Sequence, residues 1–223
     1  MNAGPLAALL ISLKVAFWAT LVILPPGVLL GLLLARRNFA GKSVIETLTY
    51  LPLVLPPTAI GYLLLRLLAR HGPLGKATLG FDPDLLFTWK GAVVATAIMA
   101  LPLVARTARV AFEQVDPRLE AMGLTLGLTP ARVFLQITLP LAGRGIAASA
   151  LLGFSRALGE FGATIIVAGN IPGKTQTLAL AIFSDIQVGA DREAMVLLGI
   201  TVLLAFAAIW IVEALLRRER TAK

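Results

Sequence analysis

Three long stretches of this sequence contain no charged residue: Val15–Ala35, Thr47–Leu65 and Ala194–Val212. At about 1.5 Å of helical rise per residue, each is long enough to cross a hydrocarbon core about 30 Å thick. Hydrophobic residues make up 58% of the chain and charged residues only 14%, whereas soluble domains have about 45–50% and about 25%. A very apolar soluble helical protein is the alternative, but uncharged stretches of this length have no place in a soluble fold. The sequence predicts an all-α, polytopic membrane protein.

The breaks between apolar stretches predict one transmembrane domain over residues 1–223 with about five spans. Pro25 and Pro26 should bend the first span, and Pro52, Pro56 and Pro57 should kink or partly unwind the second, because proline removes a backbone donor and clashes with the preceding turn. The expected spans are about 6–34, 44–69, 86–110, 145–169 and 193–216.

The distribution of basic residues predicts the topology. The N-terminus lacks the basic region of a cleavable signal peptide, and Arg36, Arg37 and Lys42 follow the first span. The positive-inside rule then places the N-terminus outside and, after five spans, the C-terminus in the cytoplasm. The loop from Arg70 to Lys90 has a weak positive excess on the outside, against the rule. We interpret the net charge of +8 as topogenic and expect no nucleic-acid partner, since the basic residues do not line one face with aromatics between them.

The residue types limit the chemistry. There is no cysteine, so disulfides and thiolate metal sites are excluded, and the single histidine, His71, lies in a turn context. We expect no catalytic residues, no metal site and no enzyme activity. Gly173-Lys174-Thr175 and Gly41-Lys42-Ser43 end like phosphate-binding loops, but neither has the required first glycine. Energy for any active process should therefore come from another subunit.

One polar segment, residues 116–140 (DPRLEAMGLTLGLTPARVFLQITLP), interrupts the hydrophobic pattern. Asp116 and Pro117 are a typical helix N-cap and first residue, and Gly127 should end that helix. Thr129-Pro130 repeats the start signal, which predicts a second short helix to about Thr138. Pro140 should mark re-entry toward the membrane.

The first of these helices carries an apolar stripe of Leu119, Met122 and Leu126, flanked by Arg118, Glu120 and Arg132. A charged, structured cytoplasmic segment of this kind suits docking to a partner. The alternative is an interfacial loop that packs on its own bundle. Spacing alone leaves both open.

The ending Gly127, nine residues, Ile137, one residue, Leu139, Pro140 resembles the EAA loop of binding-protein-dependent ABC importer permeases. The resemblance implies a coupling helix that sits in a groove of the ATPase subunit. The family's Glu-Ala-Ala falls on Ala121, Met122 and Gly123, none of which matches, and Glu120 is one position early. The predicted coupling residues are Arg118, Leu119, Glu120, Ala121, Met122, Gly123, Leu126, Gly127, Ile137, Leu139 and Pro140.

Three further stretches, LPLVLPP (Leu51–Pro57), FSRALGEFGAT (Phe154–Thr164) and AGNIPGKTQTLALAI (Ala168–Ile182), resemble the permease of molybdate ABC importers. RALGEFGA is shared with sulfate/thiosulfate permeases, so sulfate, thiosulfate or tungstate remains the alternative cargo. The resemblance implies a homodimer in the inner cell membrane, with two ATPase subunits that bind ATP and Mg²⁺. It also implies a periplasmic or extracellular molybdate-binding protein, and no cofactor in this chain.

Arg156 and Glu160 lie four residues apart near the middle of the predicted fourth span, hence on one helix face. Charges there are costly and pair or face a cavity. They are either a pathway or gate constellation or a structural ion pair, and both readings stay open. A tetrahedral dianion crossing the membrane needs donors without tight binding, although small residues are also common in helix packing. The pathway candidates are Thr58, Ser155, Arg156, Glu160, Gly162 and Thr164.

Asn170-Ile171-Pro172-Gly173 predicts a turn with Pro-Gly in type II positions, and residues 177–187 predict a short outer or re-entrant helix. The turn falls outside, where the resemblance implies contact with the binding protein through Asn170, Pro172, Gly173 and Lys174. A plain connecting loop is the alternative.

Two other function classes are considered. An ion-coupled secondary transporter could use Arg156 and Glu160 as a charge relay, and it would transport without an ATPase. A membrane-embedded enzyme would need a reactive constellation that this sequence lacks.

Overall fold

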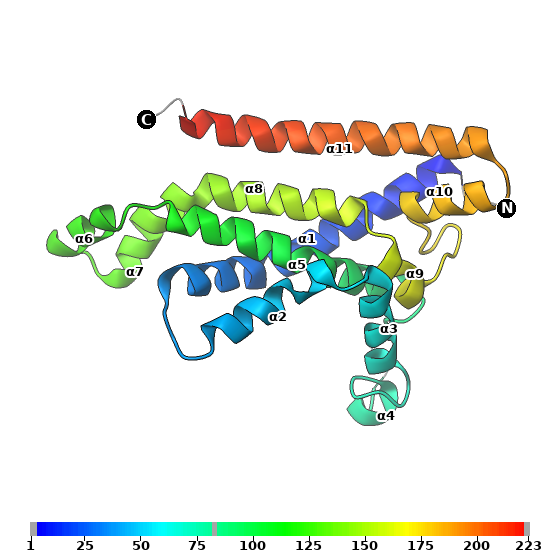
Figure 1. Cartoon of the computed structure of the whole chain (residues 1–223), viewed down its shortest axis with the longest axis horizontal. Coiled ribbons are helices and arrows are strands. Elements are labelled where there is room, and N and C mark those ends of the chain that lie inside the picture. The colour runs from blue at the N-terminus through cyan, green and yellow to red at the C-terminus, as the bar shows by residue number, and fades with distance from the viewer. Residues whose placement is uncertain (1–3, 82–83, 221–223) are drawn as a thin grey trace.

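The computed structural model describes residues 4–81 and 84–220, and every regular element in this part of the chain is a helix. The long helices run along the length of the molecule, and the described part of the chain begins and ends at opposite ends of it (Figure 1). The helices are α1 Pro5–Arg36, α2 Lys42–Val54, α3 Pro57–Leu68, α4 Lys76–Leu79, α5 Trp89–Glu113, α6 Pro117–Thr125, α7 Pro130–Val133, the π-helical turn η1 Phe134–Thr138, α8 Leu139–Leu158, α9 Gly162–Ala168, α10 Leu178–Gln187 and α11 Asp191–Arg220.

The described residues contain four helices that are long and apolar enough to cross a membrane. They cover Pro5–Arg36, Trp89–Glu113, Pro130–Leu158 and Asp191–Ile211, and the bent pair α2 and α3 makes up to five. The predicted all-α, polytopic fold is confirmed.

Small residues bring α1 and α5 together at the centre of the bundle. A Cβ atom on Gly27 would lie 2.7 Å from Val104 Cγ1, and one on Gly31 would lie 2.8 Å from the backbone nitrogen of Arg109. A Cβ on Gly153 of α8 would lie 2.6 Å from the other methyl group of the same side chain, Val104 Cγ2. Close approach through small residues is the usual way in which membrane helices pack. α1 also continues through Pro25 and Pro26 as one helix.

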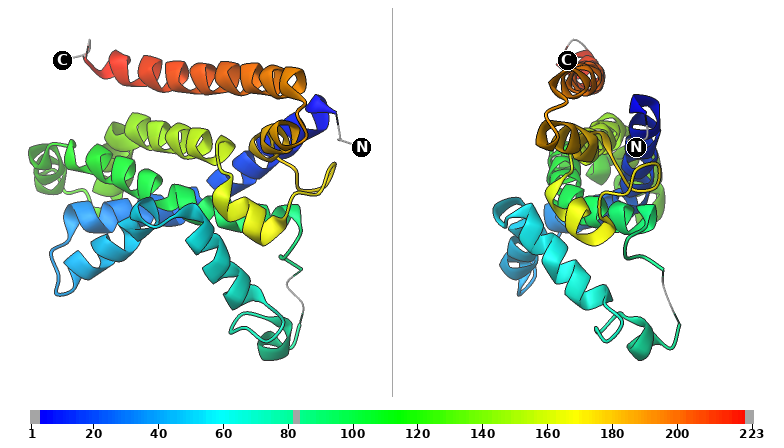
Figure 2. Two further views of the ribbon diagram at one scale, coloured as in Figure 1. Left: turned by 45° about the vertical axis from the view of Figure 1, so that its right-hand side comes forward. Right: turned by 90° about the vertical axis from the view of Figure 1, so that its right-hand side faces the viewer.

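The predicted second span is broken, as its prolines indicate. α2 ends at Val54, α3 begins at Pro57, and the two helices meet at 111°. Leu55 and Pro56 are extended, with ψ of 143° and 133°, because a residue that precedes proline is driven out of the helical region. The predicted kink or partial unwinding of the stretch 44–69 is therefore confirmed, and the bent pair counts as one span if both halves belong to a single crossing. α3 and α4 lead away from the long helices (Figure 2).

The helix at the predicted fourth span, about 145–169, has different bounds in the structure. The helix begins at Pro130, passes through the π-helical turn at Phe134–Thr138 and ends at Leu158. Pro140 therefore lies within a helix that runs from Pro130 to Leu158, in the first turn of α8. The N–H of Leu139 bonds to the carbonyl of Phe134, five residues back, and we attribute the tolerance of proline to this widened turn. At the other end, residues 159–161 interrupt the helix, and α9 is a separate short helix.

Candidate functional site

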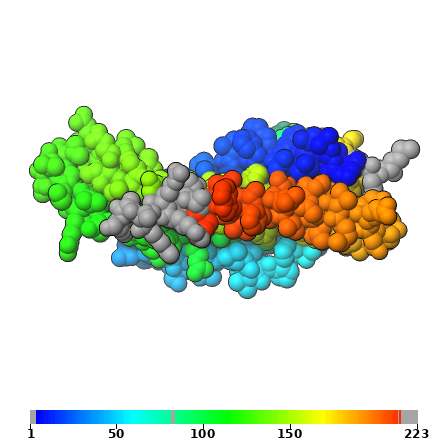
Figure 3. Space-filling model, turned by 90° about the horizontal axis from the view of Figure 1, so that it is seen from above, coloured from blue at the N-terminus to red at the C-terminus, as the bar shows by residue number. Residues whose placement is uncertain are grey.

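The polar segment predicted to dock a partner projects from one end of the bundle. α6, together with α7 at the start of the helix 130–158, lies beyond the ends of α1 and α5, and the space-filling view shows this region as a protrusion (Figures 1 and 3). Its predicted caps are confirmed: Asp116 Oδ1 accepts from the N–H of Arg118 at 2.9 Å, and Thr129 Oγ1 accepts from that of Arg132 at 3.4 Å. Gly127 follows the end of α6 and has a φ of +84°, a backbone conformation that favours glycine.

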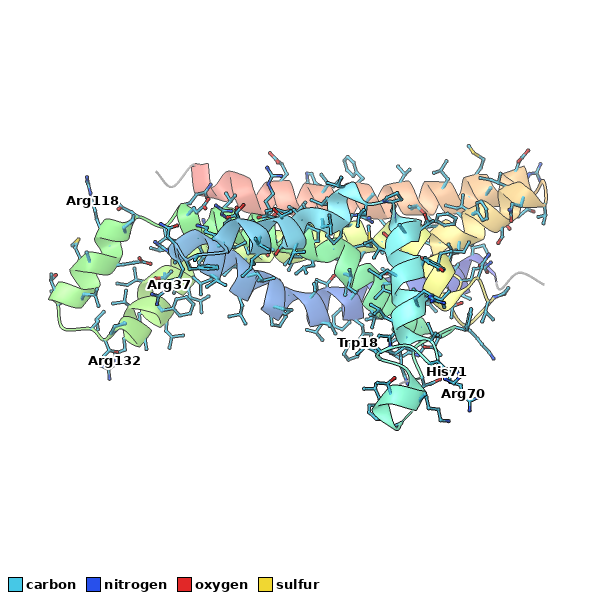
Figure 4. The ribbon with its side chains drawn as sticks, turned by 60° about the horizontal axis from the view of Figure 1, so that its bottom comes forward. Trp18, Arg37, Arg70, His71, Arg118 and Arg132 are labelled. Carbon is cyan, nitrogen blue, oxygen red and sulfur yellow. The ribbon has the colours of Figure 1, made fainter. Side chains whose placement is uncertain are left out.

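The apolar stripe of α6 faces outward. Leu119, Met122 and Leu126, here called the apolar ridge, are 42%, 58% and 81% exposed. Arg118 and Arg132 point away from the body at this end, whereas Arg70 and His71 lie at the distant end near α4 (Figure 4). An exposed apolar surface flanked by arginines is suited to bind another protein.

The inner face of α6 is fixed by a close contact with η1. A Cβ atom on Gly123 would lie 2.7 Å from Ile137 Cδ1 and 3.1 Å from Val133 Cγ2. Gly123 occupies the position of the last alanine of Glu-Ala-Ala, and an alanine there would force the Ile137 side chain to shift, because the added Cβ would lie 2.7 Å from its terminal methyl group. Gly123 and Ile137 thus pack against each other inside the segment. An added Cβ on Gly127, the glycine of the motif, would have no atom within 4 Å, and Leu139 and Pro140 belong to the helix that follows.

Glu120 points inward and pairs within the chain. Its Oε1 lies 2.8 Å from Nη2 of Arg36, at the end of α1, and accepts a hydrogen bond of 2.6 Å from the hydroxyl of Thr138. No spacing rule predicts this contact, because Arg36 is 84 residues away in sequence. A second ion pair, missed for the same reason, joins Arg109 of α5 to Glu46 of α2 at 2.8 Å. Arg109 also pairs with Glu113, four residues later in the sequence, and this contact could have been found from the spacing.

Arg156 and Glu160 form the ion pair that their spacing predicts, 2.8 Å from Nη1 to Oε2. The carboxylate side chain is 1% exposed and the guanidinium side chain 29%. Oε1 of Glu160 also accepts from the N–H of Ala163 at 2.9 Å, capping the first turn of α9. Glu160 is therefore fixed on both oxygens, and Arg156 is the member of the pair that reaches the surface.

The remaining pathway candidates gather around the two helix breaks. A Cβ atom on Gly162 would lie 2.8 Å from Pro57 Cβ and 3.3 Å from the nitrogen of Thr58, so α3 and α9 begin side by side. The hydroxyls of Ser155 and Thr164 donate to the carbonyls of Leu151 and Phe161, both at 2.8 Å. Each proton is already engaged, and the pathway role of these two residues stays a prediction.

The loop before α10 has the predicted type II turn. The N–H of Lys174 bonds to the carbonyl of Ile171 at 3.1 Å, and Gly173 has a φ of +73°. The predicted short helix is α10, capped by Thr177. Asn170 donates through its side chain to Ser184 Oγ at 2.6 Å, so it holds the turn to α10 and is less free to contact a partner than Pro172, Gly173 and Lys174, which are exposed.

A cavity of about 440 Å³ opens beside this turn. Lys14, Thr88, Trp89, Gly173 and Lys174 line it, and Nζ of Lys14 lies 3.7 Å from the centroid of the Trp89 ring. The two lysines make it electropositive. Across residues 4–81 and 84–220, no three His, Asp or Glu side chains come together as a metal site.

Comparisons with known proteins agree with this arrangement. Residues 27–221 match the family described as "Binding-protein-dependent transport system inner membrane component". The chain is 45% identical to the molybdenum transport system permease protein ModB of Haemophilus influenzae, over 96% of this chain and 94% of that one. It is 35% identical to the sulfate transport system permease protein CysT of Salmonella typhimurium, over 92% and 76%. Among solved structures, a bacterial alginate ABC transporter matches with a TM-score of 0.75 at 17% identity, over 96% of this chain and 78% of that one.

Proposed function

This chain belongs to the family of binding-protein-dependent transport system inner membrane components, and we propose that it is the membrane-spanning permease subunit of an ATP-driven importer of molybdate. It is a multi-pass membrane protein and a transporter subunit, with no catalysis of its own. The observation that carries the proposal is the apolar ridge, held out beyond the bundle on the projecting α6.

Molybdate is favoured over sulfate by the degree of similarity. The identity is 45% to a molybdenum permease along nearly both full lengths, against 35% to a sulfate permease. Tungstate has the same charge and shape as molybdate, so a site for one should admit the other. In importers of this kind the binding protein selects the cargo, and the permease must then pass a tetrahedral dianion.

The ATPase docks, in this proposal, on the apolar ridge. Leu126 is four-fifths exposed, and its neighbours Leu119 and Met122 are also exposed. Burial of such side chains stabilises a complex by about 1.5–3 kcal/mol each when fully removed from water. Arg118 and Arg132 lie on the same projecting segment and point away from the body (Figure 4), so they would meet acidic residues of the partner. ATP and Mg²⁺ belong to that subunit.

The end of the molecule that carries the ridge also indicates how the chain is oriented in the membrane. The projecting end carries Arg36, Arg37 and Lys42 as well as the ridge, so we place it in the cytoplasm. The N-terminus and the turn at residues 171–174 then lie outside and the C-terminus inside, consistent with the opposite ends of the chain in Figure 1.

We place the translocation pathway along the two helix breaks. Arg156 contributes a partly exposed guanidinium whose charge is partly balanced by buried Glu160. The pair therefore offers donors to a dianion without the full charge that would trap it. Thr58 is exposed and begins α3 beside Gly162. These groups lie at the surface of one chain, so the passage needs a second wall. A second copy, related by two-fold symmetry, would supply it, with one ATPase on each.

The binding protein docks, in this proposal, on the outer turn. Pro172, Gly173 and Lys174 are exposed beside the electropositive cavity, so acidic side chains of the binding protein would fit there. Lys174→Glu should weaken binding of the loaded binding protein, and the wild-type affinity should fall with rising salt. An unchanged affinity in Lys174→Glu would count against this surface.

The whole proposal is tested by co-expression with the cognate ATPase. The purified complex should hydrolyse ATP faster when binding protein and molybdate are both present than with either alone. A complex with two copies of this chain and two of the ATPase is expected by mass measurement in detergent. Failure of the ATPase to assemble with this chain would overturn the proposal and favour the secondary transporter.

A further inference from the structure

Glu120, one of the two acidic residues of the projecting segment, pairs with residues of this chain. Oε1 of Glu120 contacts Nη2 of Arg36 at 2.8 Å and the hydroxyl of Thr138 at 2.6 Å. These three residues belong to different elements: the last turn of α1, the middle of α6 and the end of η1. A single carboxylate oxygen thus joins the projecting helix to the bundle at two places.

The contact is sheltered from water. The Arg36 and Glu120 side chains are 25% and 23% exposed, and Thr138 is 3% exposed. A hydrogen bond to a charged group is stronger and more directional than one between neutral groups, and partial burial reduces screening by salt. The position of α6 relative to α1 is therefore fixed by a short, oriented interaction, in contrast to the ridge on its opposite face.

α1 is suited to carry a displacement across the membrane. It is one helix of 32 residues, it packs on α5 through Gly27 and Gly31, and its Ser12 accepts a hydrogen bond of 2.7 Å from the N–H of Leu178 at the start of α10. A movement of the Arg36 end is thus connected to the outer elements near the turn at 171–174.

We propose that Glu120 is a positioning residue that passes movement of the coupling helix α6 to α1 through Arg36, and to α8 through Thr138. This inference rests on the proposed function, because it presumes that an ATPase moves α6. The ridge binds the ATPase and Glu120 transmits its motion. The acidic residue one position early in the motif then has a role within the chain and none in the ATPase contact.

The experiment uses the full complex with ATPase and binding protein in proteoliposomes. For each variant, ATPase co-purification, basal hydrolysis, hydrolysis stimulated by loaded binding protein, and molybdate taken up per ATP are measured. Glu120→Gln and Arg36→Gln should keep co-purification and basal hydrolysis but lower the stimulation and the uptake per ATP several-fold. Thr138→Val should give a smaller loss in the same direction.

The charge-swapped double variant Arg36→Glu with Glu120→Arg should recover part of the stimulation that either swapped single variant loses. Glu113→Gln is the matched control: Glu113 is a nearby cytoplasmic acid, and its loss leaves Arg109 paired with Glu46. It should behave like wild type.

Three results would overturn the inference. The first is loss of ATPase co-purification in Glu120→Gln, which would place Glu120 in the ATPase contact, and the second is normal stimulation and uptake in that variant. The third is no recovery in the charge-swapped variant when it assembles with the ATPase. If that variant does not assemble, Thr138→Val decides, since unchanged coupling there would also contradict it. A wild-type complex without any stimulation would instead count against the proposed function.

Discussion

Glu160 and Arg156 form an ion pair whose two halves lie in different surroundings. The Glu160 carboxylate is almost fully buried and caps α9 through Ala163, while the Arg156 guanidinium is partly exposed. The sequence left open whether the pair is structural or part of a pathway. The geometry divides these roles between the two residues, and the first two predictions separate them.

Glu160→Ala should destabilise the protein. The substitution leaves the partly exposed Arg156 without its partner and removes the charged acceptor that caps α9, and a hydrogen bond to a charged group contributes about 1.5–3 kcal/mol. The melting temperature of the purified protein in detergent should fall clearly. Glu160→Gln, which retains an acceptor for the N–H of Ala163, should lose less. Equal stability of Glu160→Ala and wild type would contradict the structural role.

Arg156→Gln should reduce molybdate uptake more than it reduces assembly. The variant removes the exposed positive charge beside the pathway, so passage of a dianion should slow by about tenfold or more, which corresponds to about 1.4 kcal/mol in the barrier. Uptake is measured against complex yield and basal ATP hydrolysis. Arg156→Lys should recover part of the rate. Wild-type uptake by Arg156→Gln would remove this residue from the pathway.

Leu126→Asp should prevent stable binding of the ATPase without unfolding the chain. Leu126 is 81% exposed, so the free subunit loses little packing, whereas a carboxylate would be buried unpaired in the complex. Co-purification of the ATPase is the readout. Leu74→Asp is the control, an exposed leucine before α4 at the other end of the molecule, and it should leave ATPase binding intact.

Gly123 and Gly127 should respond differently to a larger side chain. In Gly123→Val the new atoms would meet Ile137 and Val133, so α6 must move and coupling of hydrolysis to uptake should be lost. Gly127→Ala meets no atom within 4 Å but must hold a positive φ, at a cost of about 1–2 kcal/mol. It should therefore retain most of the coupling. Equal effects of both substitutions would contradict the packing described for η1.

Helix caps and turns, which depend on the preferences of neighbouring residues, could be predicted from the sequence. The caps at Asp116 and Thr129, the left-handed Gly127 and the Pro172-Gly173 turn all follow from the preferences of single residues, and the structure confirms them. The break between α2 and α3 was also foreseeable, because three prolines lie within six residues of each other.

The bounds of the helix at the fourth span differ from the prediction for a specific reason. Pro140 was read as a helix boundary, but the π-helical turn before it lets the helix continue, and nothing in the local sequence signals such a turn. The Arg36–Glu120 and Arg109–Glu46 pairs were missed because they join segments 84 and 63 residues apart. Only the packing of α1, α2, α5 and α6 brings them together.

The most direct test of the account is molybdate uptake by the reconstituted complex of this chain, its ATPase and its binding protein. Uptake should require ATP on the ATPase side of the membrane and binding protein on the opposite side. Excess tungstate should compete more strongly than excess sulfate. Molybdate transport by this chain alone under an ion gradient, with no ATPase bound, would contradict it.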